Sequence, residues 1–132
     1  MNKHKLFLNG EWLDSAAGET FEDINPATLE PIGLFQKGSM DDVNHAVDSA
    51  EEAFDSWSRT PPPQRAKILY RAARLLEERK EELARLMTME NGKVLPEARG
   101  DVQEAIDMAY YAAGEGRRLF GETTPSELPN KF

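Results

Sequence analysis

The sequence has 132 residues, which is enough for one domain or for a part of a larger one. Hydrophobic residues make up 39% of the chain and the formal net charge is −8, so we expect a folded chain without a nucleic-acid partner, because phosphate binding requires clustered Lys and Arg. The chain has no cysteine, which excludes a disulfide, a thiolate zinc site and a cysteine nucleophile within these residues.

The apolar stretches of the sequence are short. None approaches the roughly 18 residues that a membrane-spanning helix needs. The N-terminus is basic, but only Leu6, Phe7 and Leu8 follow before Asn9-Gly10, which is too few for a signal peptide. We therefore expect a soluble cytoplasmic protein that has no membrane partner.

The first 38 residues are predicted to form a small antiparallel β-unit. Asn9-Gly10 separates two short apolar segments, 6–8 and 11–13, and this dipeptide favours a type I′ hairpin turn. Residues 20–24 alternate between apolar and polar as strands do, and residues 31–36 form another short strand. The intervening Asn25-Pro26 is typical of a break between strands.

A first helix is predicted over residues 39–57. Ser39 followed by Asp42 is typical of a capping box at a helix start. Apolar residues then recur at spacings of three and four, which gives one apolar face: Val43, Ala46, Val47, Ala50, Ala53, Phe54 and Trp57. We expect Trp57 to fill a core, with ligand stacking as the alternative.

Two further helical regions are predicted, over residues 64–90 and 101–120. Residues 77–82 contain no apolar side chain, so the first of these helices is either exposed or bent there. Asn91-Gly92 is expected to end that helix, and Pro96 to prevent its simple continuation, with a short turn over 97–99. Alanines and glycines in the last helix favour close packing on another element, and residues 122–132 indicate a linker or extended strand.

No motif in the sequence identifies a catalytic centre. Gly92-Lys93 lacks the remaining residues of a phosphate-binding loop, and Gly114-Glu115-Gly116 lacks the third glycine of a dinucleotide fingerprint. His4 and His45 have no nearby partner for zinc. Glu90 stands out because it lies where a helix ends beside a glycine turn. It is either a surface acid of the last turn or an acceptor for a backbone N–H, a lysine or a cation.

The order of short motifs along the chain resembles the N-terminal segment of the NAD(P)-dependent aldehyde dehydrogenase family. Each motif is weak alone, but their order and spacing are specific and cover the chain from about residue 6 to its end. One departure is Leu29, which stands where the family usually has a glycine. The matching segments are 8–12, 20–21, 24–28, 42–43, 46–47, 50, 53–54, 57, 65–66, 69, 75–76, 90–93, 97–98 and 121–132.

The resemblance implies a fold class and a division of the chain. We expect an α+β fragment, with the N-terminal β-hairpin unit and three helical regions, that forms part of the α/β aldehyde dehydrogenase fold. Residues 1–38 would be the β-unit, residues 39–121 the helical part of the cofactor-domain scaffold, and residues 122–132 a linker toward the oligomerisation strand.

The resemblance also implies a function for the parent protein. That protein would oxidise an aldehyde to a carboxylic acid with NAD or NADP, and would form a homo-oligomer. The family's nucleophile and main cofactor-binding residues lie downstream of residue 132, so no catalytic or cofactor residue is assigned here. The fragment alone, whose partner would be the remainder of the chain, is expected to be inactive and to bind no NAD(P). The alternative is a non-catalytic module that self-associates or binds a partner.

One auxiliary site is implied by the same resemblance. Some family members hold a monovalent cation, whose ligands match the backbone carbonyls of Asp23 and Ile24 and the carboxylate of Glu90. Hard oxygen ligands suit Na⁺ or K⁺. The family's site takes a further ligand from beyond residue 132, so the site would be incomplete here.

Overall fold

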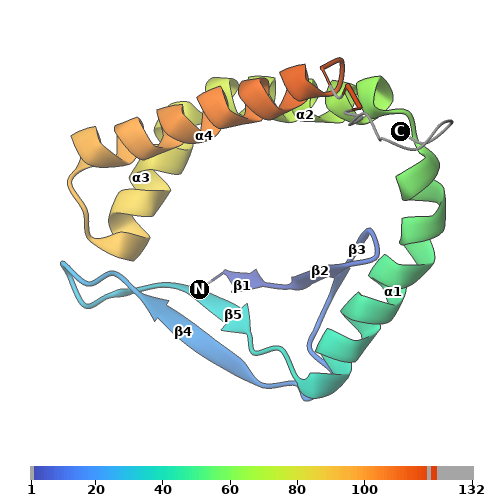
Figure 1. Ribbon diagram of the computed structural model, residues 1–132. Coiled ribbons are helices and arrows are strands. Elements are labelled where there is room, and N and C mark those ends of the chain that lie inside the picture. The colour runs from blue at the N-terminus through green and yellow to red at the C-terminus, as the bar shows by residue number, and fades with distance from the viewer. Residues whose placement is uncertain (1, 119, 122–132) are drawn as a thin grey trace, which may run out of the picture.

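The computed structural model describes residues 2–118 and 120–121, in which strands precede helices along the chain (Figure 1). This arrangement confirms the predicted α+β class. The predicted segment 122–132 lies outside the described residues. The elements are β1 (Lys3–His4), β2 (Leu6–Leu8), β3 (Glu11–Leu13), β4 (Thr20–Ile24), β5 (Pro31–Gln36), α1 (Met40–Arg59), α2 (Pro62–Glu78), α3 (Lys80–Asn91) and α4 (Leu95–Glu115).

The strands form two small sheets rather than one antiparallel unit. β2 and β3 form the predicted hairpin, whose turn residues Asn9 and Gly10 have φ angles of 49° and 82°, as a type I′ turn requires. The other sheet has the order β1-β5-β4. β4 and β5 are antiparallel, but β1 pairs in parallel with β5. The predicted all-antiparallel unit is therefore wrong for β1, because a two-residue strand carries no sequence signal for its partner.

A polar junction joins the β-unit to the start of α1. Ser39 caps the helix: its Oγ accepts from the Asp42 N–H, and the Asp42 carboxylate accepts from the Ser39 N–H at 2.7 Å. The same carboxylate accepts from Ser15 Oγ at 2.7 Å and from the Ala16 N–H at 3.0 Å. Ser15 is buried and donates its N–H to Oε1 of buried Gln36 at 2.8 Å. The predicted capping box is confirmed, and it also anchors the loop that follows β3.

The helical part differs from the prediction at two places between its helices, and α4 also ends at Glu115 rather than at residue 120. The segment predicted as one helix over 64–90 is two helices, because Arg79 leaves helical geometry with φ −103° and ψ 12°. This position lies within the run that lacks apolar residues, so no apolar side chain of the run packs on a neighbour to hold the helix straight there. α4 begins at Leu95, not at residue 101, because Pro96 occupies the first turn, where its missing N–H costs nothing. The predicted turn over 97–99 is therefore wrong.

The core lies where α3 and α4 pack together. Its buried residues are Ala84, Ala98, Val102 and Ile106. Farther along, α4 packs closely on α2: a Cβ added at Gly116 would lie 2.7 Å from the Ala66 Cβ. The predicted close packing of small residues in the last helix is thus confirmed.

Helix α1 contributes nothing to this core. It forms one side of an open arc, between the β-unit and the paired helices α2 and α4 (Figure 1). No residue of α1 is buried, and Trp57 is 45% exposed, with the Arg65 guanidinium 5.9 Å from the centre of its ring. The apolar face of α1 was predicted correctly, but the expectation that Trp57 fills a core is wrong, because the few contacts of α1 with other described elements leave its ring half-exposed. Across the described ranges, no helix is both long and apolar enough to cross a membrane.

Candidate functional site

Two short segments that are far apart in the sequence meet in the structure. Gly92, at the end of α3, has a φ of 82°, and a Cβ added there would lie 2.8 Å from the Pro26 Cγ. Pro26 lies in the turn after β4, where the Ala27 N–H donates to the Asn25 side chain at 2.9 Å. This close approach brings the end of β4 to the end of α3. As a result, Asp23 and Glu90 come to line the same pocket.

A row of rings crosses the three-stranded sheet beside this meeting point. His4, Phe35 and Phe21 lie directly opposite one another on β1, β5 and β4. The His4 and Phe35 rings stack with centroids 4.5 Å apart, and those of Phe35 and Phe21 are 5.9 Å apart. A Cβ added at Gly33 would lie 2.9 Å from the Phe35 ring and 3.0 Å from the His4 ring. The two rings therefore lie close to Gly33, where there is no room for a side chain.

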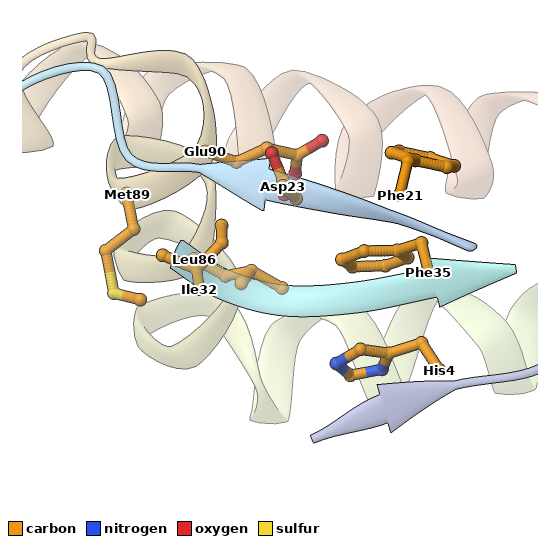
Figure 2. Close-up of a pocket in the computed structure, with 8 residues that line it drawn as sticks. All are labelled: His4, Phe21, Asp23, Ile32, Phe35, Leu86, Met89 and Glu90. Atoms are coloured by element: carbon orange, nitrogen blue, oxygen red, sulfur yellow. The ribbon is translucent and has the colours of Figure 1, made fainter. Parts of the chain in front are cut away.

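The sheet and α3 enclose a cavity of about 330 Å³ that is open to solvent. Figure 2 shows the rings of Phe21, Phe35 and His4 along the sheet, and Leu86, Met89 and Glu90 reaching in from α3. The lining is mainly apolar and contains two carboxylates but no Lys or Arg. The complete set of lining residues is His4, Phe21, Asp23, Ile32, Phe35, Leu86, Met89 and Glu90.

The two carboxylates of the pocket are not neutralised by the surrounding chain. Asp23 is half-buried and Glu90 is exposed. In the part of the chain that the structure describes, neither forms an ion pair. The two carboxylates therefore favour cations over anions in this pocket.

The residues implied as cation ligands lie together only in part. The side chains of Asp23 and Glu90 line the pocket, and Ile24 follows Asp23 at a shift in the β4–β5 register. Opposite Ile24 stands Pro31, which has no N–H to donate to β4. Within the described residues, no group of three or more His, Cys, Asp or Glu side chains could hold a metal. The donors suit a hard cation, but they do not form a complete shell.

Sequence reasoning missed the aromatic side of this pocket. Phe21 and Asp23 are two residues apart on one strand, so their shared face could have been expected. The contribution of His4 to the pocket could not have been expected from the sequence, because it depends on the parallel pairing of β1 with β5, which was not predicted.

The neighbouring Lys93 is engaged in the fold. Its ammonium forms an ion pair with Asp101 on α4, and the hydrogen bond that it donates to that carboxylate raises the pKa of Lys93 above its ordinary value. Gly92-Lys93 therefore serves as a helix end that is tied to the next helix.

The chain matches proteins of known type over nearly its whole length. The sequence model of the aldehyde dehydrogenase family matches residues 12–132. The malonate-semialdehyde dehydrogenase of Bacillus velezensis is 43% identical over 126 residues, which cover 96% of this chain and 26% of that protein. The alpha-ketoglutarate semialdehyde dehydrogenase of Haloferax volcanii is 42% identical over 127 residues, which cover 96% of this chain and 26% of that protein.

The structure also matches solved structures. A betaine aldehyde dehydrogenase from Staphylococcus aureus in complex with NAD⁺ superposes with a TM-score of 0.91 at 32% sequence identity. The match covers 96% of this chain and 26% of that one. This chain therefore spans about a quarter of the length of the relatives it matches.

Proposed function

Because this chain belongs to the aldehyde dehydrogenase family, we propose that its parent protein oxidises an aldehyde to a carboxylic acid with NAD or NADP. The observation that carries the proposal is the family match over residues 12–132. In chemistry of this kind a nucleophile attacks the aldehyde carbon and a hydride passes to the nicotinamide. The 132 residues contain no cysteine, so these residues do not supply a thiolate.

The role that we propose for these residues is that of a scaffold. The apolar face of α1 includes Val47, which is 58% exposed, and Phe54, which is 67% exposed. Large apolar patches are uncommon on the surfaces of independent domains. We propose that the remaining three-quarters of the parent covers this face, and that the 132 residues alone are inactive and bind no NAD(P).

The substrate class that we propose is a semialdehyde that carries a carboxylate. The two curated relatives described above are both named for such substrates, malonate semialdehyde and alpha-ketoglutarate semialdehyde. The betaine aldehyde dehydrogenase of similar structure is named for a different aldehyde, which makes betaine aldehyde a useful comparison substrate. The choice between NAD and NADP rests with the remainder of the parent.

We further propose that the end of β4 and Glu90 supply part of a monovalent cation site. The carbonyls of Asp23 and Ile24 and the Glu90 carboxylate are hard oxygen donors, which suit Na⁺ or K⁺. Their approach through Pro26 and Gly92 supports this proposal. The remaining ligands would come from the parent.

We also propose that the parent assembles as a homo-oligomer. We further propose that the chain divides into a β-unit (1–38), a helical part (39–121) and a linker (122–132). A cytoplasmic location stays a prediction. The alternative function, a self-associating module without catalysis, is supported by the same exposed face of α1 and is tested by the experiment below.

A chimera tests the scaffold role. These residues would replace the matching 126 residues of the Bacillus velezensis relative, and reduction of NAD and NADP would be followed with malonate semialdehyde and with betaine aldehyde. We expect activity from the chimera and none from the 132-residue chain alone. Activity of the short chain would refute the scaffold role, and a folded but inactive chimera would favour the module.

A pair of matched variants tests whether the rest of the parent contacts the apolar face of α1. Val47→Asp places a charge on the apolar face of α1, whereas His45→Asp places one on the exposed polar side of the same helix. We expect the first variant to abolish soluble, active chimera, because a buried unpaired charge is strongly unfavourable, and the second to leave it active. Equal activity of the two variants would show that the face stays uncovered.

A further inference from the structure

The pocket between the sheet and α3 is larger and more apolar than a site for a monovalent ion requires. Its volume of about 330 Å³ falls at the lower end of the range for small-molecule sites, roughly 300–1,000 Å³. Most of its wall is apolar, and the polar groups gather at Asp23 and Glu90 (Figure 2). A bare ion would leave the wall formed by Phe21 and Phe35 without a contact.

We propose that this pocket binds an organic ammonium ion with an apolar or aromatic body. An ammonium group carries three N–H donors and one positive charge, which suit two carboxylates that have no cation partner in the described residues. The body of the ligand packs along the rings of Phe21 and Phe35 and against Leu86 and Met89.

The aromatic row adds selectivity for a cation. The face of a phenyl ring carries a partial negative charge, so it attracts a positive group that lies within about 6 Å. Phe21 is 51% exposed, which leaves its ring accessible to a ligand from solvent. Carboxylate ligands are disfavoured, because the lining contains two carboxylates and no Lys or Arg to pair with them.

This proposal is separable from the monovalent cation site, although the two share Glu90. The monovalent ion uses the backbone carbonyl of Asp23, which any substitution of that side chain retains. The ammonium uses the Asp23 carboxylate and the Phe21 ring. Asp23→Asn therefore weakens binding of the ammonium but retains the carbonyl ligand of K⁺. The proposal does not depend on the aldehyde dehydrogenase activity of the parent.

The test is a titration of the 132-residue chain with benzylammonium, followed by calorimetry and by NMR shifts of the amides in β4 and at the end of α3. Benzyl alcohol, which has the same body without the charge, and KCl are titrated in parallel. We expect benzylammonium to bind at least about tenfold more tightly than benzyl alcohol, because charge-assisted hydrogen bonds are stronger than neutral ones. Equal binding of the two compounds, or binding of K⁺ alone, would overturn the proposal.

Three variants locate the site. We expect Asp23→Asn and Phe21→Leu each to weaken benzylammonium binding by roughly three- to tenfold. Glu22→Gln removes a neighbouring charge on the same strand, but outside the pocket lining, and should leave the affinity unchanged. Circular dichroism confirms that each variant is folded. Equal loss in Glu22→Gln and Asp23→Asn would show general charge attraction and overturn the assignment of the pocket.

Discussion

Leu29 adopts a backbone conformation that disfavours its side chain. Its φ is +60°, in the left-handed region, within the turn between β4 and β5. The turn is held by the Leu29 N–H, which donates to the Asn25 carbonyl at 2.8 Å, and by the Asn25 N–H, which donates to the Glu30 carbonyl at 2.9 Å. A left-handed residue with a β-carbon costs roughly 1–2 kcal/mol. We therefore expect Leu29→Gly to stabilise the chain.

The size of the effect follows from three contributions. Relief of the strain gains about 1–2 kcal/mol. A glycine loses more backbone freedom on folding, which costs about 0.5–1 kcal/mol. The leucine side chain is 77% exposed, so its removal sacrifices little burial. The net gain in the free energy of unfolding is about 0.5–1 kcal/mol, which raises Tm by a few degrees in a chain of this size.

The assay is urea unfolding followed by tryptophan fluorescence, with Leu29→Ala as the matched control. Alanine also removes the side chain but keeps the β-carbon, so the strain persists and we expect no gain. Leu29→Asn should lie between the two, because asparagine tolerates the left-handed region better than most residues. A gain in Leu29→Ala as large as that in Leu29→Gly would refute the argument from backbone strain.

Three further predictions concern other parts of the chain. Gly92→Ala should lower the free energy of unfolding by about 1–2 kcal/mol or more, because φ is 82° and the new Cβ meets Pro26, whereas Gly100→Ala, within α4 and with open space around it, should not. Hydrogen bonds from the Ser39 N–H and Ser15 hydroxyl hold the pKa of Asp42 well below its ordinary 3.8. This contribution to stability is present above about pH 4 and is lost as the pH falls toward the lowered pKa. Urea unfolding between pH 2 and 7 should therefore show a weaker acid dependence for Asp42→Asn. The isolated chain should self-associate through α1, and light scattering should show less self-association for Phe54→Asp. A chain without this substitution that stays monomeric at high concentration would contradict the prediction.

The features that sequence reasoning predicted well are those set by a few neighbouring residues. The turn at Asn9-Gly10, the cap of Ser39 with Asp42, and the helix end at Gly92 each depend on local backbone chemistry. Such interactions join residues at most four positions apart, so the sequence alone is sufficient to indicate them.

The features that were missed depend on which segments come together. The pairing of β1 with β5 joins residues about thirty positions apart, and two-residue strands have no periodicity from which to infer it. The exposure of Trp57 was missed for a similar reason. Its helical spacing predicts an apolar face, but burial requires a second surface that packs on that face. Periodicity therefore predicted the faces of the helices, but not what covers them.

The candidate site combines both kinds of information. Asp23 and Glu90 were connected only through a family resemblance, since 66 positions separate them in the sequence. The structure supplies a physical cause for their proximity: Gly92 ends α3 with a left-handed residue that has no Cβ, and this lets Pro26 pack against the helix end. A side chain at position 92 would push the turn after β4 away from α3. The glycine is therefore needed for two reasons, its backbone angle and its contact, and the second also positions the two carboxylates around one pocket.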